Sequence, residues 1–151
     1  MSDSITFHFP ELPVSVNKLY TVAHGRKILS KQGKAYRNDF ITSGGGISKT
    51  RLMAFEADLE QEYQIHIWCL FPYEELYTAT YGFRKNTKSP FKDIDVDNMA
   101  KIVIDCVAAL VGIRDRNNFT VCLHKREATE PGLIALLEPL DLEEDPYPIP
   151  S

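Results

Sequence analysis

Three aspartates at alternate positions, followed by an amide and a lysine, are the residues whose types and spacing best suit chemistry. Asp93, Asp95 and Asp97 precede Asn98, and Lys101 follows four residues after the last aspartate. In an extended segment alternate side chains point to the same side, so the three carboxylates would converge. Converging carboxylates repel one another and are tolerated mainly when a hard cation or solvent separates their charges. The run therefore predicts a divalent-metal site beside a positive charge.

The residues after this acidic run predict an amphipathic helix. Apolar side chains recur at steps of three and four residues, at Met99, Ile102, Val103, Cys106 and Leu110. Asp97 occupies the expected N-cap position, and the helix should extend to about Leu110 and end near Gly112. The N-terminus of a helix favours phosphate groups through its backbone N–H donors. Carboxylates, a metal, an ammonium group and a helix start together favour phosphodiester chemistry.

Two plainer interpretations compete with this one. Asp97 alone is explained by ordinary helix capping, and a solvated acidic loop would account for Asp93 and Asp95. An EF-hand calcium loop also opens with Asp-x-Asp-x-Asp. Counting from Asp93, Asn98 stands where that loop requires Gly and Ile104 stands where it requires Glu, so the EF-hand interpretation fails.

Positive charge gathers on both sides of the acidic run. The net charge of −4 misleads, because the segment 141–145 alone carries four acids and no base. Between residues 18 and 51 there are eight bases against one acid, Asp39; the bases are Lys18, Arg26, Lys27, Lys31, Lys34, Arg37, Lys49 and Arg51. A second basic run, Arg84, Lys85, Lys88 and Lys92, precedes the acidic residues. Basic flanks around an acidic centre are typical of metal-dependent nucleases, although a basic run can also be a solvated face.

Composition indicates one globular domain. Of 151 residues, 44% are hydrophobic and 25% charged, and no stretch approaches the roughly 18 apolar residues of a membrane span. The N-terminus lacks a signal-peptide pattern. We therefore expect a cytoplasmic protein, encoded by a bacterium or phage, that does not bind a membrane. The three cysteines, Cys69, Cys106 and Cys122, lie in apolar stretches at no metal-site spacing and predict reduced core residues. The four histidines, His8, His24, His66 and His124, also lack ligand spacing.

Hydrophobic periodicity and turn residues predict a small α/β or α+β domain, with a mixed sheet flanked by two or three helices. We expect strands at 4–9, 63–71, 119–126 and 133–138, the last two as a hairpin, and a further hairpin at 22–29 around Gly25. Helices are expected at 31–40 after an N-cap at Ser30, at 49–60, and from Asp97 onward. Residues 43–46 should be the most flexible stretch, and 72–90 should be irregular. The predicted domain covers 1–138, and 139–151 form an acidic, proline-rich tail.

Three separated pieces resemble one family, the RusA family of Holliday-junction resolvases. The segment 12–20, with Pro13, Asn17 and Tyr20, is similar to the family's Pro-Ser-x-Asn-x-x-Tyr opening. Residues 30–37 look like the Ser-x-x-Gly-x-x-Tyr-Arg piece that follows it. Residues 95–101 together with Asp105 resemble the Asp-x-Asp-Asn-x-x-Lys-x-x-x-Asp signature. The resemblance covers about residues 5–137 and is weakest from 42 to 92.

The resemblance implies a homodimeric endonuclease that binds four-way DNA junctions and nicks two opposing strands with Mg²⁺, leaving 5′-phosphates. Asp95, Asp97 and Asp115 would hold the metal, and Lys101 would complete the catalytic set by stabilising the scissile phosphate or the leaving oxygen. The residues expected to contact DNA are Asn17, Lys18, Tyr20, Lys31, Lys34, Arg37, Lys92 and Asn98. Lys101 pairing with Asp97 and Asp105, and Asn98 bonding its own loop, are the structural alternatives.

One departure from the family concerns its paired Asp-Asp before the next strand. Only Asp115 is acidic here, and it is followed by Arg116. Registering the segment on Phe119 makes Asp115 the first member of the pair, whereas registering it on Lys125 makes it the second. In the first case the metal site lacks a ligand unless Asp93 or Asp105 substitutes. A junction-binding protein of the same fold with impaired catalysis, and a protein-interaction module with an acidic loop, are therefore the competing hypotheses.

Overall fold

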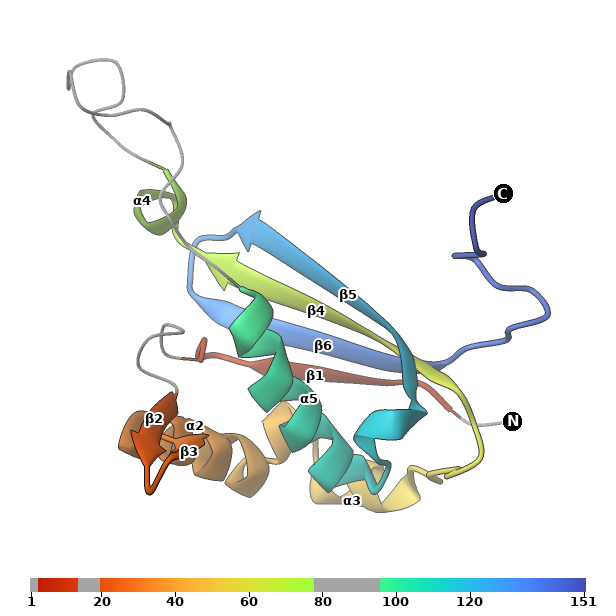
Figure 1. Ribbon diagram of the computed structural model, residues 1–151, viewed down its shortest axis with the longest axis horizontal. Coiled ribbons are helices and arrows are strands. Elements are labelled where there is room, and N and C mark those ends of the chain that lie inside the picture. Colours follow the sequence, from red (N-terminus) through yellow and green to blue (C-terminus); the bar gives the residue numbers. More distant parts are fainter. Residues whose placement is uncertain (1–2, 14–19, 78–95) are drawn as a thin grey trace.

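The computed structural model describes residues 3–13, 20–77 and 96–151, and it forms a mixed α+β domain (Figure 1). A four-stranded sheet contains β1 (Ile5–Phe9), β4 (Tyr63–Phe71), β5 (Asn118–Glu127) and β6 (Gly132–Pro139). A separate hairpin contains β2 (Tyr20–Ala23) and β3 (Arg26–Leu29). The helical elements are α2 (Lys31–Thr42), η1 (Gly44–Gly46), α3 (Lys49–Ala54), α4 (Tyr73–Leu76), α5 (Asp97–Val111) and η2 (Asp115–Asn117).

The strand order of the large sheet is β1-β6-β4-β5, with β4 parallel to β5 and antiparallel to β6. The predicted hairpin between 119–126 and 133–138 is therefore wrong, because β4 lies between the two strands. Side chains along one face of β4 are completely buried, which favours a central position for this strand. The β5–β6 connection passes the end of β4, where the N–H of Ala128 donates to the carbonyl of Phe71 at 2.9 Å.

The core lies between one face of this sheet and helices α2 and α5 (Figure 1). Ile65 and Ile67 of β4 are fully buried, as is Val103 of α5. On β1, the ring of Phe9 contacts that of Tyr36 edge to face at 5.4 Å between centroids. The Tyr36 hydroxyl donates to the carbonyl of Glu11 at 3.0 Å, so this tyrosine packs and anchors the segment that follows β1.

The two long helices begin and end on local signals. The hydroxyl of Ser30 accepts from the N–H of Gly33 at 3.0 Å, as expected for the N-cap of α2. Gly112 ends α5 with a left-handed φ of 84°. The N-cap of α5 is Val96, and Asp97 is the first helical residue, which corrects the predicted cap by one position. The carbonyl of Val96 already accepts from Met99, so the helix begins one residue earlier.

The structure of residues 43–46 differs most clearly from the prediction. The stretch predicted to be most flexible packs against β1, and Gly44 and Gly45 are buried. All three glycines have positive φ, between 60° and 81°, which only glycine adopts readily. A Cβ at Gly46 would collide with the carbonyl oxygen of His8, so the close approach of two backbones explains the glycine.

Two smaller differences concern the middle of the chain. Helix α3 ends at Ala54 rather than near residue 60, because Phe55 takes extended backbone and enters the core. The segment predicted to be irregular from residue 72 contains the short helix α4, and 78–95 lie outside the described residues.

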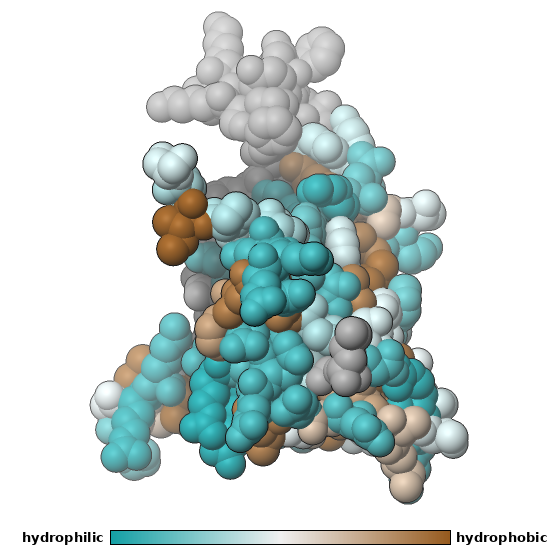
Figure 2. Space-filling model, turned by 90° about the vertical axis from the view of Figure 1, so that its right-hand side faces the viewer, coloured by the Kyte–Doolittle hydropathy of each residue, from teal (hydrophilic) through white to brown (hydrophobic). Residues whose placement is uncertain are grey.

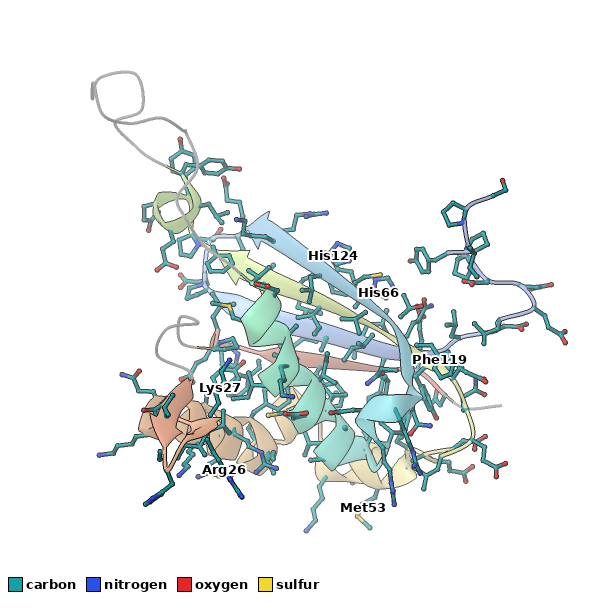
Figure 3. The ribbon with its side chains drawn as sticks, in the orientation of Figure 1. Arg26, Lys27, Met53, His66, Phe119 and His124 are labelled. Carbon is teal, nitrogen blue, oxygen red and sulfur yellow. The ribbon has the colours of Figure 1, made fainter. Side chains whose placement is uncertain are left out.

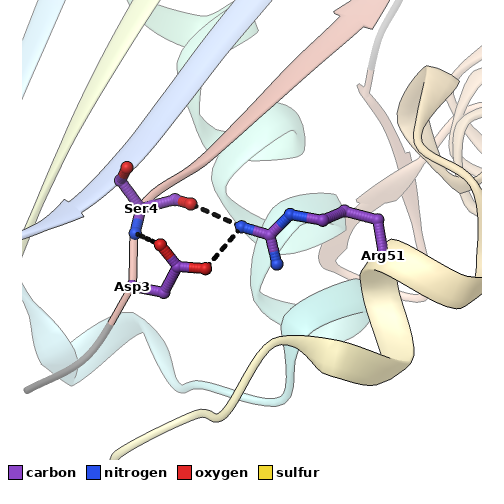
Figure 4. Close-up of polar contacts among 3 residues, drawn as sticks. All are labelled: Asp3, Ser4 and Arg51. Atoms are coloured by element: carbon purple, nitrogen blue, oxygen red, sulfur yellow. Dashed lines mark hydrogen bonds and ion pairs between the residues drawn. The ribbon is translucent and has the colours of Figure 1, made fainter.

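Both ends of the described chain lie at the same side of the domain (Figure 1). The guanidinium of Arg51 contacts the carboxylate of Asp3 and the carbonyl of Ser4, each at 2.7 Å (Figure 4). Seen from this side, the surface is mostly hydrophilic (Figure 2). Residues 140–151 contain no helix or strand. Within the described ranges, no helix combines the length and apolar character that a bilayer span requires.

The cysteines occupy two environments. Cys69 and Cys106 are buried in the core, as predicted, and burial raises the pKa of each thiol to about 11. Cys122 is half-buried on β5, and Tyr147 contacts it.

Candidate functional site

A cavity of about 300 Å³ lies between α5, η2 and the start of β5. Lys101 and Asp105 follow Asp97 at steps of four residues, so all three lie on one face of α5. Asp115 reaches the same cavity from η2. The complete lining is Asp97, Ala100, Lys101, Ile104, Asp105, Asp115, Asn118 and Val121.

Asn117 holds η2 in the place that brings Asp115 to the cavity. Its side chain is buried and accepts from the backbone N–H of Arg114 at 3.0 Å. Its amide nitrogen donates to the carbonyls of Leu59 at 2.9 Å and Gln61 at 3.1 Å. One side chain therefore fastens the turn after α5 to the loop before β4.

The electrostatics of the cavity centre on Asp105. Burial raises the pKa of its carboxyl group, and the neighbouring Asp115 raises it further by charge repulsion and by a side-chain hydrogen bond. The positive charges of Lys101 and Arg37 act in the opposite direction. Arg37 comes from α2, which packs against α5, so a base predicted to contact DNA lies beside the acidic residues.

The other predicted site residues fall into three groups. Lys31 and Lys34 are exposed on α2, and Arg37 is half-buried. Tyr20 begins β2 and Asn98 lies in the first turn of α5, but their side chains are not described. Outside the described residues lie Asn17, Lys18, Lys92, Asp93 and Asp95.

Where the RusA family has paired aspartates, this chain has a single aspartate, Asp115, followed by Arg116. Asp115 and Arg116 are both exposed, but only Asp115 lines the cavity. The position after Asp115 therefore brings no side chain to the carboxylates.

The donor chemistry of the cavity suits a hard cation. Within 3–13, 20–77 and 96–151, no three His, Cys, Asp or Glu side chains gather closely enough to hold a metal ion. Mg²⁺ does not require three, because it commonly binds one or two carboxylates and keeps several waters. Asn118 also lines the cavity, and its amide oxygen is shielded from solvent without a hydrogen-bond partner within these ranges. The carboxylate oxygens of the cavity are therefore better ligands for Mg²⁺ or Mn²⁺ than for a soft transition metal.

The sequence did not indicate Asn118 as a site residue, and no local pattern would have revealed it. The same holds for a row of stacked rings on the sheet face opposite the helices, formed by His66, Trp68 and His124. The two imidazoles come from adjacent strands, and their nearest nitrogens are 3.4 Å apart (Figure 3). Both features depend on strand register, which the sequence alone does not specify.

Comparison with known proteins adds no family to this description. A scan against models of protein families gives no match, and a search of curated proteins finds no relative.

Proposed function

We propose that this chain is a divalent-metal-dependent endonuclease that resolves four-way DNA junctions by paired nicking. The observation that carries the proposal is the shared cavity of Asp97, Lys101, Asp105 and Asp115. Helix α5 and the turn η2 that follows it contribute carboxylates and an ammonium group to one small volume. The resemblance of the sequence motifs to the RusA family supplies the substrate, four-way DNA.

In this proposal Asp97 and Asp115, together with Asp95, hold Mg²⁺. When bound, the ion activates water and neutralises charge that develops at the phosphorus. Lys101 supplies a fixed positive charge for the scissile phosphate or the leaving oxygen. Arg37 adds positive charge beside Asp105, and the exposed Lys31 and Lys34 extend the basic surface along α2.

Two opposing strands must be cut to resolve a junction, so the proposal includes a homodimer with one site per protomer. Size-exclusion chromatography with light scattering measures the oligomeric state directly. A strictly monomeric protein that still makes paired nicks in one binding event would contradict the dimer.

The test of the activity uses the full chain, a labelled synthetic four-way junction, and Mg²⁺ or EDTA. We expect Mg²⁺-dependent nicks with 5′-phosphate ends in the wild type. Asp97→Asn should abolish cutting while junction binding persists or tightens, because repulsion of phosphate falls and the fold is retained. Lys101→Ala should lower the cutting rate about 100-fold to 1,000-fold. Glu130→Gln, an exposed acid in the β5–β6 loop, is the matched control and should cut normally.

Different outcomes separate the competing hypotheses. Cutting that continues in both Asp95→Asn and Asp97→Asn would overturn the metal-site assignment. Junction binding without nicking in any divalent metal would identify a catalytically impaired junction-binding protein, which the exposed Arg116 favours. Failure to bind any DNA at low salt would leave the protein-interaction module.

A further inference from the structure

The hairpin of β2 and β3 forms a small sheet of its own beside α2 (Figure 1). Its strands are joined by two residues, His24 and Gly25, whose φ values are 52° and 73°. Positive φ at both positions of a two-residue turn matches the twist of the flanking strands and gives a tight hairpin. The predicted hairpin around Gly25 is therefore present, and its turn is exposed.

Two apolar side chains of this hairpin remain exposed. Val22 is 75% exposed and Ile28 is 38% exposed. Val22 pairs with Lys27, whereas Ile28 pairs with Thr21 in the adjacent pair of the ladder. Paired residues share a face and successive pairs alternate, so the two apolar side chains lie on opposite faces of the hairpin. The described part of the chain therefore leaves most of Val22, close to the turn, open to solvent.

Each face of the hairpin also carries a base. Lys27 shares the face of Val22 through their pairing, and Arg26 shares the face of Ile28, two residues further along β3. Both bases are exposed, and their side chains project from the hairpin (Figure 3). One apolar and one cationic side chain are thus presented on each face.

The charge around the hairpin is complementary to a polyanion. Residues 20–38 contain no acid, whereas they contain five bases, which are Arg26, Lys27, Lys31, Lys34 and Arg37. Lys31 and Lys34 are exposed on α2, which follows the hairpin directly. Clustered bases of this kind bind the phosphates of nucleic acids without regard to sequence. The charge therefore favours DNA as the partner of the hairpin.

An exposed apolar side chain between bases suits DNA whose stack of base pairs is interrupted. Proteins that kink DNA insert apolar side chains between base steps and partly unstack them. Unstacking costs least where pairing or stacking is already disturbed. The branch point of a four-way junction interrupts the stack, whereas a linear duplex does not. The hairpin therefore matches a branch point better than continuous duplex.

We propose that the β2–β3 hairpin enters the branch point of four-way DNA, where Val22 lies between unstacked bases and Arg26 and Lys27 hold phosphates of adjoining arms. This inference rests on the proposed junction-binding function. It assigns recognition of the branch to an element that contributes no residue to the cavity of Asp97 and Asp115. Substitutions should therefore separate recognition of the branch from cutting.

The experiment uses the full chain in EDTA and a synthetic four-way junction that carries 2-aminopurine beside the branch point. Binding of the wild type should raise the 2-aminopurine fluorescence about 2-fold or more, because the labelled base loses its stacked neighbours. A linear duplex with the same label should show no rise. The measurement detects insertion of the hairpin without any cutting of the DNA.

Val22→Thr tests the apolar side chain, because it keeps the branched shape and places a hydroxyl group between the bases. We expect this variant to lose most of the fluorescence rise and to bind the junction about 10-fold more weakly, with unchanged affinity for duplex. Val22→Ile should behave like the wild type. Met53→Thr, at another exposed apolar position, 77% exposed on α3, is the matched control and should also bind normally.

Arg26→Gln combined with Lys27→Gln tests the cationic side chains. This double variant should bind junction and duplex more weakly by similar factors, because both substrates present phosphates. Each lost phosphate contact should reduce the slope of log K against log salt by about 0.9, measured by fluorescence anisotropy. Unchanged affinity and slope would contradict contact between the hairpin and DNA.

The outcomes distinguish this inference from the function on which it rests. A wild type that binds and nicks junctions without a rise in fluorescence would overturn the insertion and leave the nuclease proposal standing. Unchanged junction preference in Val22→Thr would do the same. Equal losses of junction and duplex affinity in Val22→Thr, with a native circular dichroism spectrum, would also exclude a role specific to the branch. A wild type that binds no DNA at low salt would overturn both proposals.

Discussion

The carboxyl group of Asp105 is subject to opposing influences within one cavity. Burial and Asp115 raise its pKa, whereas Lys101 and Arg37 lower it. A bound cation would compensate the negative charge of Asp115, the side chain that raises this pKa. Asp105 thus lies in the cavity to which the proposed function brings Mg²⁺ and phosphate.

A second group of titratable residues lies on the opposite sheet face. The rings of Trp68 and His124 stack at 4.9 Å between centroids with planes 16° apart, and His66 continues the row. His66 also faces Glu138, with a nitrogen–oxygen distance of 3.8 Å. Burial lowers the pKa of His124, and the positive charges of Arg126 and His66 lower it further.

At the residue scale, we predict that Arg126→Gln raises the pKa of His124, measured by NMR titration of the imidazole protons. The lowered pKa means that the folded state binds this proton less readily than the unfolded chain. Stability should therefore fall as the pH drops from about 6.5 through the folded pKa, and Arg126→Gln should flatten that dependence. Lys125→Gln is the control, because its position faces the helices and not His124. A His124 pKa that does not move in Arg126→Gln would contradict the role of Arg126.

At the scale of elements, the turn at residues 44–46 leads from α2 to α3. Its three glycines have left-handed backbone, and the turn packs on β1. The aromatic residues of α2 lie against Phe7 and Phe9 of the same strand. The turn and these rings therefore hold α2 against β1.

We predict that Gly46→Ala destabilises the protein more than Gly25→Ala, measured by urea unfolding. Both positions have positive φ, 81° and 73°, so each alanine costs about 1–2 kcal/mol in backbone conformation. Only at Gly46 does the added Cβ collide with the His8 carbonyl, whereas the space around Gly25 is open. We expect a further loss of at least about 1 kcal/mol at Gly46. Equal losses in the two variants would show that the turn is not held against β1.

At the scale of the whole molecule, charge is distributed unevenly. Arg26 and Lys27 project from the β2–β3 hairpin, far from Phe119 in the view of Figure 3, and Lys31 and Lys34 continue the basic surface on α2. Near the chain termini, acids and no bases line a groove of about 800 Å³; these acids are Asp3, Glu62, Glu138, Asp141 and Glu143. A polyanion such as DNA is therefore attracted to the α2 side and repelled from the termini.

We predict that Lys31→Ala combined with Lys34→Ala weakens junction binding and reduces its salt dependence. Each lost phosphate contact should reduce the slope of log K against log salt by about 0.9, so the pair should reduce it by about 1.8. Fluorescence anisotropy across a salt series measures the slope. Glu144→Gln, in the acidic tail, should leave the slope unchanged. An unchanged slope in the double lysine variant would place the DNA on another face.

The local sequence pattern was sufficient to predict the strands, helices and helix ends that depend on neighbouring residues. Periodicity along 63–71 predicted a strand, and the three-to-four spacing after Asp97 predicted α5. Ser30 and Gly112 marked helix ends because capping involves only adjacent backbone. The acidic run itself, with Lys101 one helical turn further, was visible in the sequence before any fold was known.

Only the tertiary structure decided which distant segments meet. The insertion of β4 between β5 and β6 and the burial of the Asn118 amide oxygen depend on strand order and register. The same is true of the pairing of His66 with His124 and the packed glycine turn. These features come from long-range burial, in which each strand takes the place that covers the most apolar surface, and a linear pattern does not encode that competition.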